Sequence, residues 1–320
     1  MISDLWRLDT LWIRDPAETR SRHELEQAAL DHFKETIMVN GEGRYEVCLP
    51  WLEGRERLQE NMNLDIVKAR CVSTATRLIA NGRYCDYDAV FEEWLRDSVI
   101  EVVPESELKN KACYLPHRGV FKEDSTTKVR PVFDASFKTG GAISLNDCLE
   151  KGPNLIEQIP PIIMRFRRER IGVVADIKRA FLQIAVAKKD RDFLRFVWWE
   201  NFAERKIKVF RHCRIVFGLN CSPFLLAAVL NLHLEECPAE IKETAEAMRK
   251  SFYVDNCVTS VPSEGKLLKF IQDSQQLLAS ACFELRGWEH SSLRAGSEQE
   301  KPIPVLGLYG TERLMFYFVF

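Results

Sequence analysis

The chain has 320 residues, of which 46% are hydrophobic and 29% charged, and its formal net charge at pH 7 is −2. This length allows one large or two ordinary domains, and the composition supports a sizeable core and argues against a membrane protein. The start lacks a basic stretch before an apolar run, and the late apolar run Leu314–Phe320 is too short to span a bilayer. We therefore expect an intracellular protein, in the cytoplasm or the nucleus.

Cysteine spacing and charge distribution narrow the function classes further. The ten cysteines include no C-x-x-C pair, so neither a zinc site nor a redox motif is predicted. Residues 165–214 carry 15 Lys/Arg against 6 Asp/Glu, and residues 108–138 carry 7 against 3, whereas residues 1–100 carry 13 against 19. A basic middle fits a surface that binds a phosphate backbone, and it fits equally well charges scattered over a solvated surface.

Residues 1–103 are predicted to form a mostly helical N-terminal extension. Apolar residues at helical spacing predict helices over 22–36 and 54–80, and Asp86 is the predicted N-cap of a third, short helix. This stretch offers no catalytic constellation, so we expect a packing or adaptor region.

After Pro104 the pattern changes to strands. Residues 114–121 and 128–134 are predicted strands joined by the polar turn 122–127, which makes a hairpin. Prolines in the first turn predict a helix over 159–168. Further strands are predicted over 171–176, 194–199 and 206–216, and Ser222-Pro223, with Ser222 as the cap, opens an apolar helix.

The last predicted hairpin covers residues 251–261. We expect Asp255 and Asn256 to form its two-residue turn, because both residue types tolerate a positive φ. Ser263 is the predicted N-cap of a helix that reaches about Ala281, and short strands are expected over 283–288 and 303–308.

Two aspartates at the ends of apolar runs are the candidate catalytic residues. Asp176 closes the run 171–176, and Asp255 lies in the run 251–258. Two carboxylates side by side on one sheet can hold a pair of divalent metal ions, as metal-assisted nucleotidyl transfer requires, and hard oxygen ligands suit Mg²⁺ or Mn²⁺. Either aspartate alone is also compatible with an ordinary strand-end residue that satisfies a turn.

The order of these features resembles the fingers and palm of reverse transcriptases, and in particular the polymerase of Pao/BEL-type LTR retrotransposons. The resemblance covers roughly residues 110–290 and rests on eight stretches in the family's order: KEDST, VRPVFDAS, SLNDCL, GPNL, ADIKRAF, DRDF, FYVD and FELR. It implies an α+β fold, with right-hand polymerase fingers and palm over residues 104–290, built as an antiparallel sheet with packed helices. Residues 291–320 would form a primer-grip-like end of the palm and a C-terminal tail that we do not place.

The resemblance also implies a role for each matching residue. Asp176 and Asp255 would bind two Mg²⁺ or Mn²⁺ ions, with Asn256 as a weak ligand. Arg130 would contact the triphosphate of the incoming nucleotide, and Lys128 or Lys122 would add charge there. The remaining roles are a steric gate against the ribose 2′-hydroxyl for Phe181, close approach to the template–nucleotide pair for Gly218, packing near the primer end for Tyr253, and a place near the primer grip for Trp288 or residues 305–308.

The predicted function is RNA-directed DNA polymerase, which copies a primed RNA or DNA template with dNTPs and needs no membrane. The chain departs from the family pattern at Asn256, where a second aspartate is usual, and we expect no thumb because the palm ends near residue 310. Two alternatives stay open. One is a catalytically inactive nucleic-acid-binding relic, and the other is a protein-interaction module in which the acidic helices act on a polymerase scaffold.

Overall fold

The structure is a computed structural model that describes residues 21–52, 58, 64–122, 128–140, 142–202, 204–291, 303–305 and 308–310. The helices are α1 (Arg22–Thr36), α2 (Leu64–Ala80), α3 (Tyr84–Arg96), α4 (Ile159–Phe166), α5 (Lys188–Arg191), α6 (Ser222–Glu235), α7 (Lys242–Arg249) and α8 (Glu264–Ala279). The strands are β1 (Met38–Val39), β2 (Tyr45–Val47), β3 (Ile100–Val102), β4 (His117–Phe121), β5 (Val129–Phe133), β6 (Ile171–Ile177), β7 (Ala185–Val186), β8 (Arg195–Asn201), β9 (Lys206–His212), β10 (Phe252–Tyr253), β11 (Asn256–Val261), β12 (Leu285–His290), β13 (Ile303–Val305) and β14 (Leu308–Gly310).

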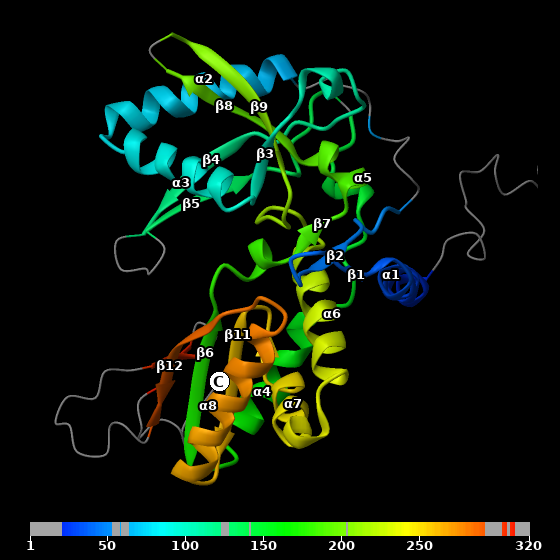
Figure 1. Ribbon diagram of the computed structural model, residues 1–320, viewed down its shortest axis with the longest axis vertical. Helices are drawn as coiled ribbons and strands as arrows, with labels where there is room; N and C mark the ends of the chain where they lie inside the picture. Colours follow the sequence, from blue (N-terminus) through cyan, green and yellow to red (C-terminus); the bar gives the residue numbers. More distant parts are fainter. Residues whose placement is uncertain are drawn as a thin grey trace, which may run out of the picture.

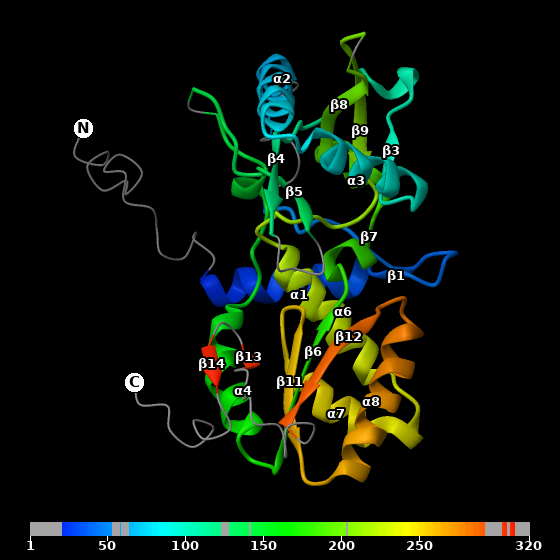
Figure 2. The ribbon, with the colours of Figure 1, turned by 90° about the vertical axis from the view of Figure 1, so that its left-hand side faces the viewer.

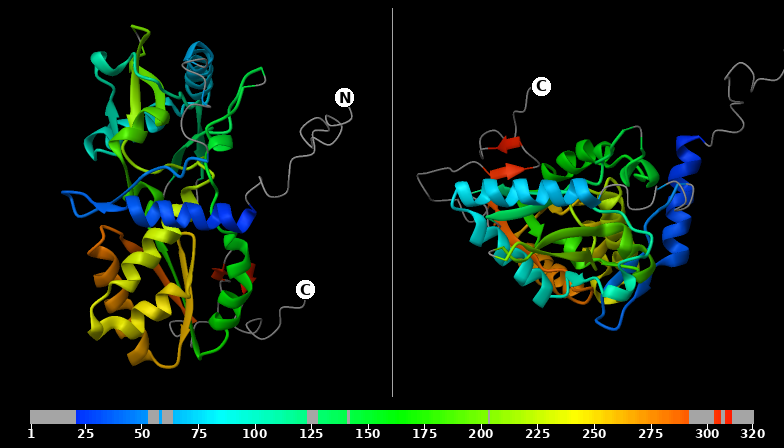
Figure 3. Two further views of the ribbon diagram at one scale, coloured as in Figure 1. Left: turned by 90° about the vertical axis from the view of Figure 1, so that its right-hand side faces the viewer. Right: turned by 90° about the horizontal axis from the view of Figure 1, so that it is seen from above.

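These elements form an α+β fold of small, mostly antiparallel sheets with packed helices, which confirms the predicted fold class. Figure 1 shows two lobes: an upper lobe with α2, α3 and strands β3, β4, β5, β8 and β9, and a lower lobe with α4, α7, α8 and strands β6, β11 and β12. Helix α1 and strands β1 and β2 lie between the lobes, next to α6 (Figure 3). Among the described residues, no helix combines the length and apolarity that crossing a membrane requires.

The lower lobe is organised by a four-stranded antiparallel sheet in the order β10-β11-β6-β12, which we call the central sheet. Alternate residues of β6, from Ile171 to Ile177, join the main hydrophobic core, in which residues of α7 and α8 also lie. Val174, on the opposite face, packs with Ile162 and Phe166 of α4. Figure 2 shows α4 on one side of this sheet and α7 and α8 on the other. Because side chains alternate along a strand, Asp176 belongs to the α4 face.

The upper lobe combines the three-stranded sheet β3-β9-β8 with the hairpin β4–β5. The hairpin confirms the strand pair predicted on either side of residues 122–127, although its turn residues 123–127 lie outside the described part. Strand β3 pairs with β9, so the segment before residue 103 contributes a strand to this sheet. Helices α2 and α3 share one hydrophobic core with both lobes. The domain boundaries at 103 and 290 stay predictions.

Helix and turn boundaries show where the sequence pattern was wrong by a residue or more. Helix α3 begins at Tyr84 with Arg83 at the N-cap, so Asp86 lies inside the first turn and is not the cap. Cys221 is the N-cap of α6, because the Ser222 hydroxyl donates instead to the Val216 carbonyl oxygen at 2.8 Å. In contrast, α1 has the predicted bounds, and the Ser263 hydroxyl accepts from the Lys266 amide at the start of α8.

The C-terminal predictions are only partly within the described residues. The strand expected over 303–308 is instead the hairpin β13–β14, whose residues 306–307 lie outside the described part. The helix expected from residue 54 is described only from Leu64, and the tail 311–320 is also outside the described residues.

Part of the basic middle lies inside the protein. Arg195 is fully buried, and the side chains of Arg211 and Arg214 are 4% and 5% exposed. Arg211 binds Glu101 at 2.6 Å and Asp192 at 2.8 Å, and Arg214 binds Glu42 at 2.8 Å. These arginines therefore form internal ion pairs. They belong neither to a phosphate-binding surface nor to a solvated surface, which were the two alternatives for the basic middle of the chain.

Candidate active site

Strand pairing brings the two predicted catalytic aspartates to the same end of the central sheet. Asn256 is the register partner of Asp176 in the antiparallel pair of β11 with β6. The next backbone contact joins Asp255 to the residue after Asp176, since the Ile177 amide donates to the Asp255 carbonyl oxygen at 2.9 Å. Asp176, in β6, and Asp255, in the turn before β11, thus lie at the same end of the central sheet although they come from distant parts of the chain.

The turn that presents Asp255 is one residue earlier than predicted. Tyr253 pairs with Asn256, so Val254 and Asp255 are the turn residues and Asn256 is the first residue of β11. Val254 takes the positive φ, at 55°, which is a strained conformation for a β-branched side chain. Strain of this kind persists only where the surrounding structure enforces it, here by the pairing of β11 with both β10 and β6.

Both aspartates line one cleft of about 100 Å³ between the lobes. Its charged lining residues come from both lobes and comprise three carboxylates and three guanidinium groups: Glu93, Asp176, Asp255, Arg130, Arg179 and Arg286. The formal charges of these side chains cancel. A ligand that carries both positive and negative charge can therefore enter the cleft without adding net charge. Its charged groups can also replace partners in the internal ion pairs, provided that the charges stay balanced.

Asp255 is the more deeply placed of the two carboxylates. Burial raises its pKa above the ordinary value, and the nearby charge of Asp176 raises it further, while Arg130 acts in the opposite direction. The Asn256 amide donates to the Asp255 carboxylate at 3.1 Å. A bound cation would counteract both effects and lower the pKa again, because it stabilises the charged form of the carboxylates.

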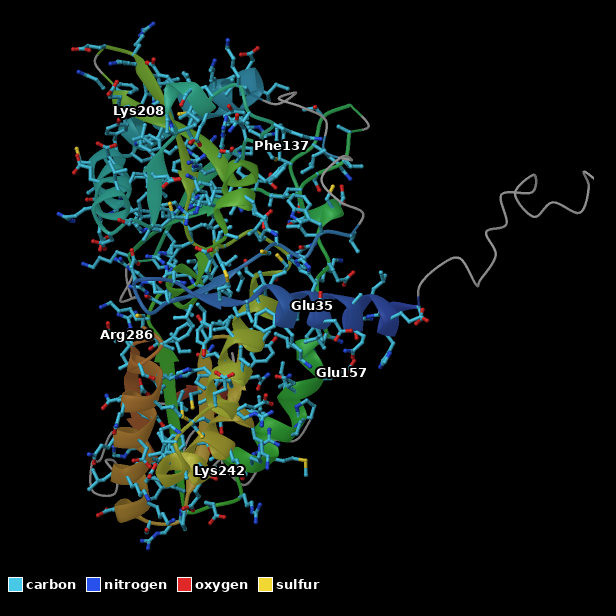
Figure 4. The ribbon with its side chains drawn as sticks, turned by 45° about the vertical axis from the view of Figure 1, so that its right-hand side comes forward. Glu35, Phe137, Glu157, Lys208, Lys242 and Arg286 are labelled. Atoms are coloured by element: carbon cyan, nitrogen blue, oxygen red, sulfur yellow. The ribbon has the colours of Figure 1, made fainter. Side chains whose placement is uncertain are left out.

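Asp176 is held from the side of β12. Arg286 is its register partner there, and the Arg286 Nε lies 3.4 Å from Asp176 Oδ2. The β6–β12 register shifts just beyond Arg286, at Gly287, which has a φ of 63°. A Cβ atom at Gly287 would lie 2.4 Å from Asp176 Oδ1, so any larger residue would displace this carboxylate from its present position. Figure 4 shows Arg286 at the end of β12 that faces the upper lobe.

A second ion pair crosses the cleft. Arg179 follows β6, and its guanidinium binds the carboxylate of Glu93 in α3 through two contacts, of 2.9 Å and 3.0 Å. The contact is bidentate, which is the strongest geometry for an arginine–carboxylate pair. It connects the strand that carries Asp176 to the upper lobe.

The other predicted site residues lie at different distances from this cleft. Arg130 in β5 lines it, whereas Lys122 and Lys128 are exposed at the turn end of the β4–β5 hairpin. Phe181 is 5% exposed and packs against Phe217 with ring centroids 4.7 Å apart. Phe217 and Trp94 line the cleft, so its aromatic lining belongs to two residues for which no role was predicted.

Gly218, Tyr253 and Trp288 are placed by internal contacts. A Cβ at Gly218 would lie 1.9 Å from the Phe133 carbonyl oxygen, so the close approach that requires this glycine is to β5. Tyr253 packs with the α4 face of the central sheet, next to Asp255. Trp288 packs against Phe270 of α8, and the structure does not bring it to the aspartate pair.

The donor set at the cleft fits a divalent ion that is bound together with a nucleotide. Mg²⁺ in proteins is usually held by one or two carboxylates plus substrate phosphates and water, and Asp176 and Asp255 supply two carboxylates. No cluster of three or more His, Cys, Asp or Glu ligands occurs among the described residues, so a cage made only of such side chains is not available there. Asn256, opposite Asp176 in the register, adds an amide but no charge.

A larger groove of about 590 Å³ adjoins the cleft along β5. Residues Val129–Pro131 line the cleft, and Val132–Asp134 line the groove. Helix α2 forms the opposite wall with Arg70, Ser73, Thr74 and Arg77, and Arg118 of β4 adds a third arginine. A groove with basic and hydroxyl side chains is suited to a phosphodiester backbone.

The comparisons with known proteins find similarity only among solved structures. No protein-family model matches the sequence, and no curated protein is significantly similar to it. One similar solved structure is the crystal structure of prototype foamy virus protease–reverse transcriptase, CSH mutant, with 17% identity and a TM-score of 0.45. The match covers 61% of this chain and 22% of that one, so the chain spans well under a third of the viral protein's length.

Proposed function

We propose that this chain is the fingers and palm of an RNA-directed DNA polymerase of the Pao/BEL retrotransposon type, acting inside the cell in the cytoplasm or the nucleus. It would extend the 3′-hydroxyl of a primer with dNTPs on an RNA or DNA template. The observation that carries the proposal is the meeting of Asp176 and Asp255 in one cleft that Arg130 also lines. The motif order along the sequence supports the retrotransposon type.

The predicted site residues have proposed roles that follow from their chemistry. Asp176 and Asp255 would hold two Mg²⁺ or Mn²⁺ ions, which when bound would lower the pKa of the primer hydroxyl and neutralise the triphosphate. Arg130 orients the triphosphate through its guanidinium donors. Phe181, through Phe217, limits the space beside the sugar and so favours deoxynucleotides. Tyr253, which pairs with Asn256 in the same hairpin, would pack near the primer end.

The basic groove beside the cleft is the proposed path of the template. Arg77 and Arg118 are exposed on its two walls and can contact phosphates, while Arg70 stacks over Phe137 at 4.0 Å. Gly218 lines the groove where β5 passes from groove to cleft, which is where the templating base would turn toward the incoming nucleotide. Lys122 and Lys128 add positive charge at the end of the β4–β5 hairpin.

Primer extension tests the proposal. The full chain is incubated with a primed RNA template, dNTPs and Mg²⁺ or Mn²⁺, and we expect incorporation that depends on the metal. Asp176→Ala should abolish it, whereas Asp65→Ala, at a residue of α2 whose side chain is 99% exposed, should leave it unchanged. Incorporation that is equal in wild type and Asp176→Ala would refute the assignment.

A nucleic-acid-binding relic without catalysis is the second candidate. Asn256 favours it, because an amide replaces a carboxylate opposite Asp176 and donates to an oxygen of Asp255 that would otherwise face a cation. If the chain is such a relic, the wild type should bind the primed template in a salt-sensitive manner. It should incorporate no dNTP with either metal ion.

Asn256→Asp separates the two candidates. The extra carboxylate should raise the affinity for Mn²⁺, because it adds an oxygen ligand and a negative charge. If the variant polymerises and the wild type does not, the chain is a relic whose site needs one residue to be restored. If both polymerise, Asn256 is compatible with catalysis and the polymerase proposal stands.

A further inference from the structure

The ion pair between Glu93 and Arg179 lies in the lining of the cleft that holds the two aspartates. Both residues line the cleft together with Asp176, Asp255 and Arg130. The side chain of Arg179 is 29% exposed and that of Glu93 is 35% exposed, so solvent reaches the pair from one side. A carboxylate bound in two contacts to a guanidinium has the same donor–acceptor geometry as a phosphate oxygen pair bound to it.

The backbone directs Arg179 to this place. Arg179 has φ 50° and ψ 42°, a left-handed conformation that is uncommon for a residue other than glycine. It is two residues beyond the end of β6, and the chain then enters the 3₁₀ turn Ala180–Gln183. Lys178, beside it, binds Glu284 at 2.7 Å instead. Of these two adjacent cations, only Arg179 lines the cleft.

The cleft is small for a ligand of nucleotide size. Its volume is about 100 Å³, whereas sites for ligands of nucleotide size usually measure about 300–1,000 Å³. Glu93 belongs to α3 in the upper lobe and Arg179 follows β6 in the lower lobe, so their contact joins the two walls of the cleft. Separating these two side chains is one way to widen it.

Charge balance favours an exchange of partners over a simple addition. The cleft's six charged side chains cancel one another, so an anion alone would enter against Glu93, Asp176 and Asp255. If a triphosphate takes Arg179 and a cation takes the aspartates, Glu93 is released toward solvent and each remaining charge keeps an opposite partner.

We propose that Arg179 binds the triphosphate of the incoming nucleotide and that Glu93 is its intramolecular substitute, which holds the cleft closed until the triphosphate displaces it. The inference rests on the proposed function for the identity of the ligand, but it concerns binding and not the chemical step. The ligand would release the Glu93 side chain, while α3 itself stays packed in the core.

Calorimetric titration of the full chain with tripolyphosphate, in the presence of Mg²⁺, tests the exchange. Glu93→Gln removes the competing charge and should lower the dissociation constant about two- to five-fold, which is the range of partly exposed ion pairs. Glu93→Ala should do the same, because no amide then remains to hold the guanidinium. Glu92→Gln, an exposed neighbour on the same helix, is the matched control and should change nothing.

Arg179 must mediate the gain if the inference is correct. Arg179→Met should weaken binding, and the double variant Glu93→Gln/Arg179→Met should bind no better than Arg179→Met alone. Thermal melting of each variant verifies that the chain is folded. Equal affinity of Glu93→Gln and Glu92→Gln would overturn the inference, as would a gain that persists without Arg179, or no binding by wild type and Glu93→Gln alike.

Primer extension keeps this inference separate from the proposed function. If the binding pattern holds and no variant extends a primer, the partner exchange stands and the polymerase assignment fails. If wild type extends a primer and the Glu93 variants bind tripolyphosphate as wild type does, the assignment stands and the exchange fails.

Discussion

The contact between Gly287 and Asp176 shows how narrowly a single residue position is constrained. Gly287→Ala would place a Cβ 2.4 Å from Asp176 Oδ1 at a φ of 63°. The aspartate must then move, so primer extension should fall by more than about tenfold, while the strained backbone lowers the free energy of unfolding by about 1 kcal/mol. Single-turnover extension and urea unfolding measure the two effects.

Gly265→Ala is the matched control for that substitution. Gly265 lies in α8, and a Cβ there would meet no atom within 4 Å. Alanine has the higher helix propensity, so this variant should gain about 0.5–1 kcal/mol in stability and keep its activity. Full activity in Gly287→Ala would show that Asp176 does not need its present position.

Two buried histidines predict how stability depends on pH. Burial lowers the pKa of His117 to about 4 and that of His212 to about 3, with the nearby His117 as a second cause for His212. Between pH 6.5 and about 4 the unfolded chain therefore binds protons that the folded chain does not. The free energy of unfolding should fall with acid through this range, by about 1.4 kcal/mol per pH unit for each histidine.

His212→Phe tests the pH prediction at one residue. The ring nitrogens of His212 have no hydrogen-bond partner within the described residues, and the ring packs against Phe133 with centroids 4.4 Å apart, so an aromatic substitute fits. Urea unfolding at pH 7 and pH 5 should show a smaller pH dependence in this variant. His23→Gln, at an exposed position, should leave the dependence unchanged. An undiminished dependence in His212→Phe would mean that another group takes up the proton.

At the scale of elements, the buried ion network joins β3, β9 and the segment after α5. Arg211 in β9 binds Glu101 in β3, Glu107 and Asp192, and these contacts lower the pKa of the Glu101 and Asp192 carboxyls against the opposing effect of burial. Arg211→Met should lower the free energy of unfolding by about 2–3 kcal/mol, because partly buried carboxylates lose their partner. Chemical denaturation measures the loss.

Lys208→Met, on the same strand, is the comparison for Arg211→Met. Lys208 binds Glu200 with both side chains at least 30% exposed, so the loss should stay below about 1 kcal/mol. Equal losses in the two variants would mean that the Arg211 network adds no more to stability than a surface pair.

Secondary structure was predictable where a local signal decides it. The capped, amphipathic α1 and the alternating β9 follow from residues close in sequence. The turn at Val254–Asp255 did not, because pairing of Asn256 with both Tyr253 and Asp176 overrides the preference of asparagine for a positive φ. Arg179 and Arg286 lie inside the motifs ADIKRAF and FELR, but their place in the cleft was not predicted. Their partners, Glu93 and Asp176, are distant in sequence and become apparent only in the folded chain. Glu93 has no local signal.

At the scale of the whole molecule, the groove between α2 and β4 predicts how binding of nucleic acid depends on salt. Arg77 and Arg118 are exposed on its walls. Neutralising both, as Arg77→Gln/Arg118→Gln, should weaken binding of a single-stranded template and reduce the slope of log affinity against log salt by about 0.7 for each phosphate that the protein no longer neutralises. Arg96→Gln, on the exposed side of α3, should not alter the slope.

The two lobes meet at the cleft, where Asp176 and Asp255 are proposed to act together on one set of cations. Binding of Mn²⁺ to the full chain, followed by electron paramagnetic resonance, tests this most directly in wild type, Asp176→Ala, Asp255→Ala and the double variant. We predict that each single substitution removes most of the binding and that the second adds little, because the two carboxylates share the ions. Retention of wild-type Mn²⁺ affinity in either single variant would contradict the account.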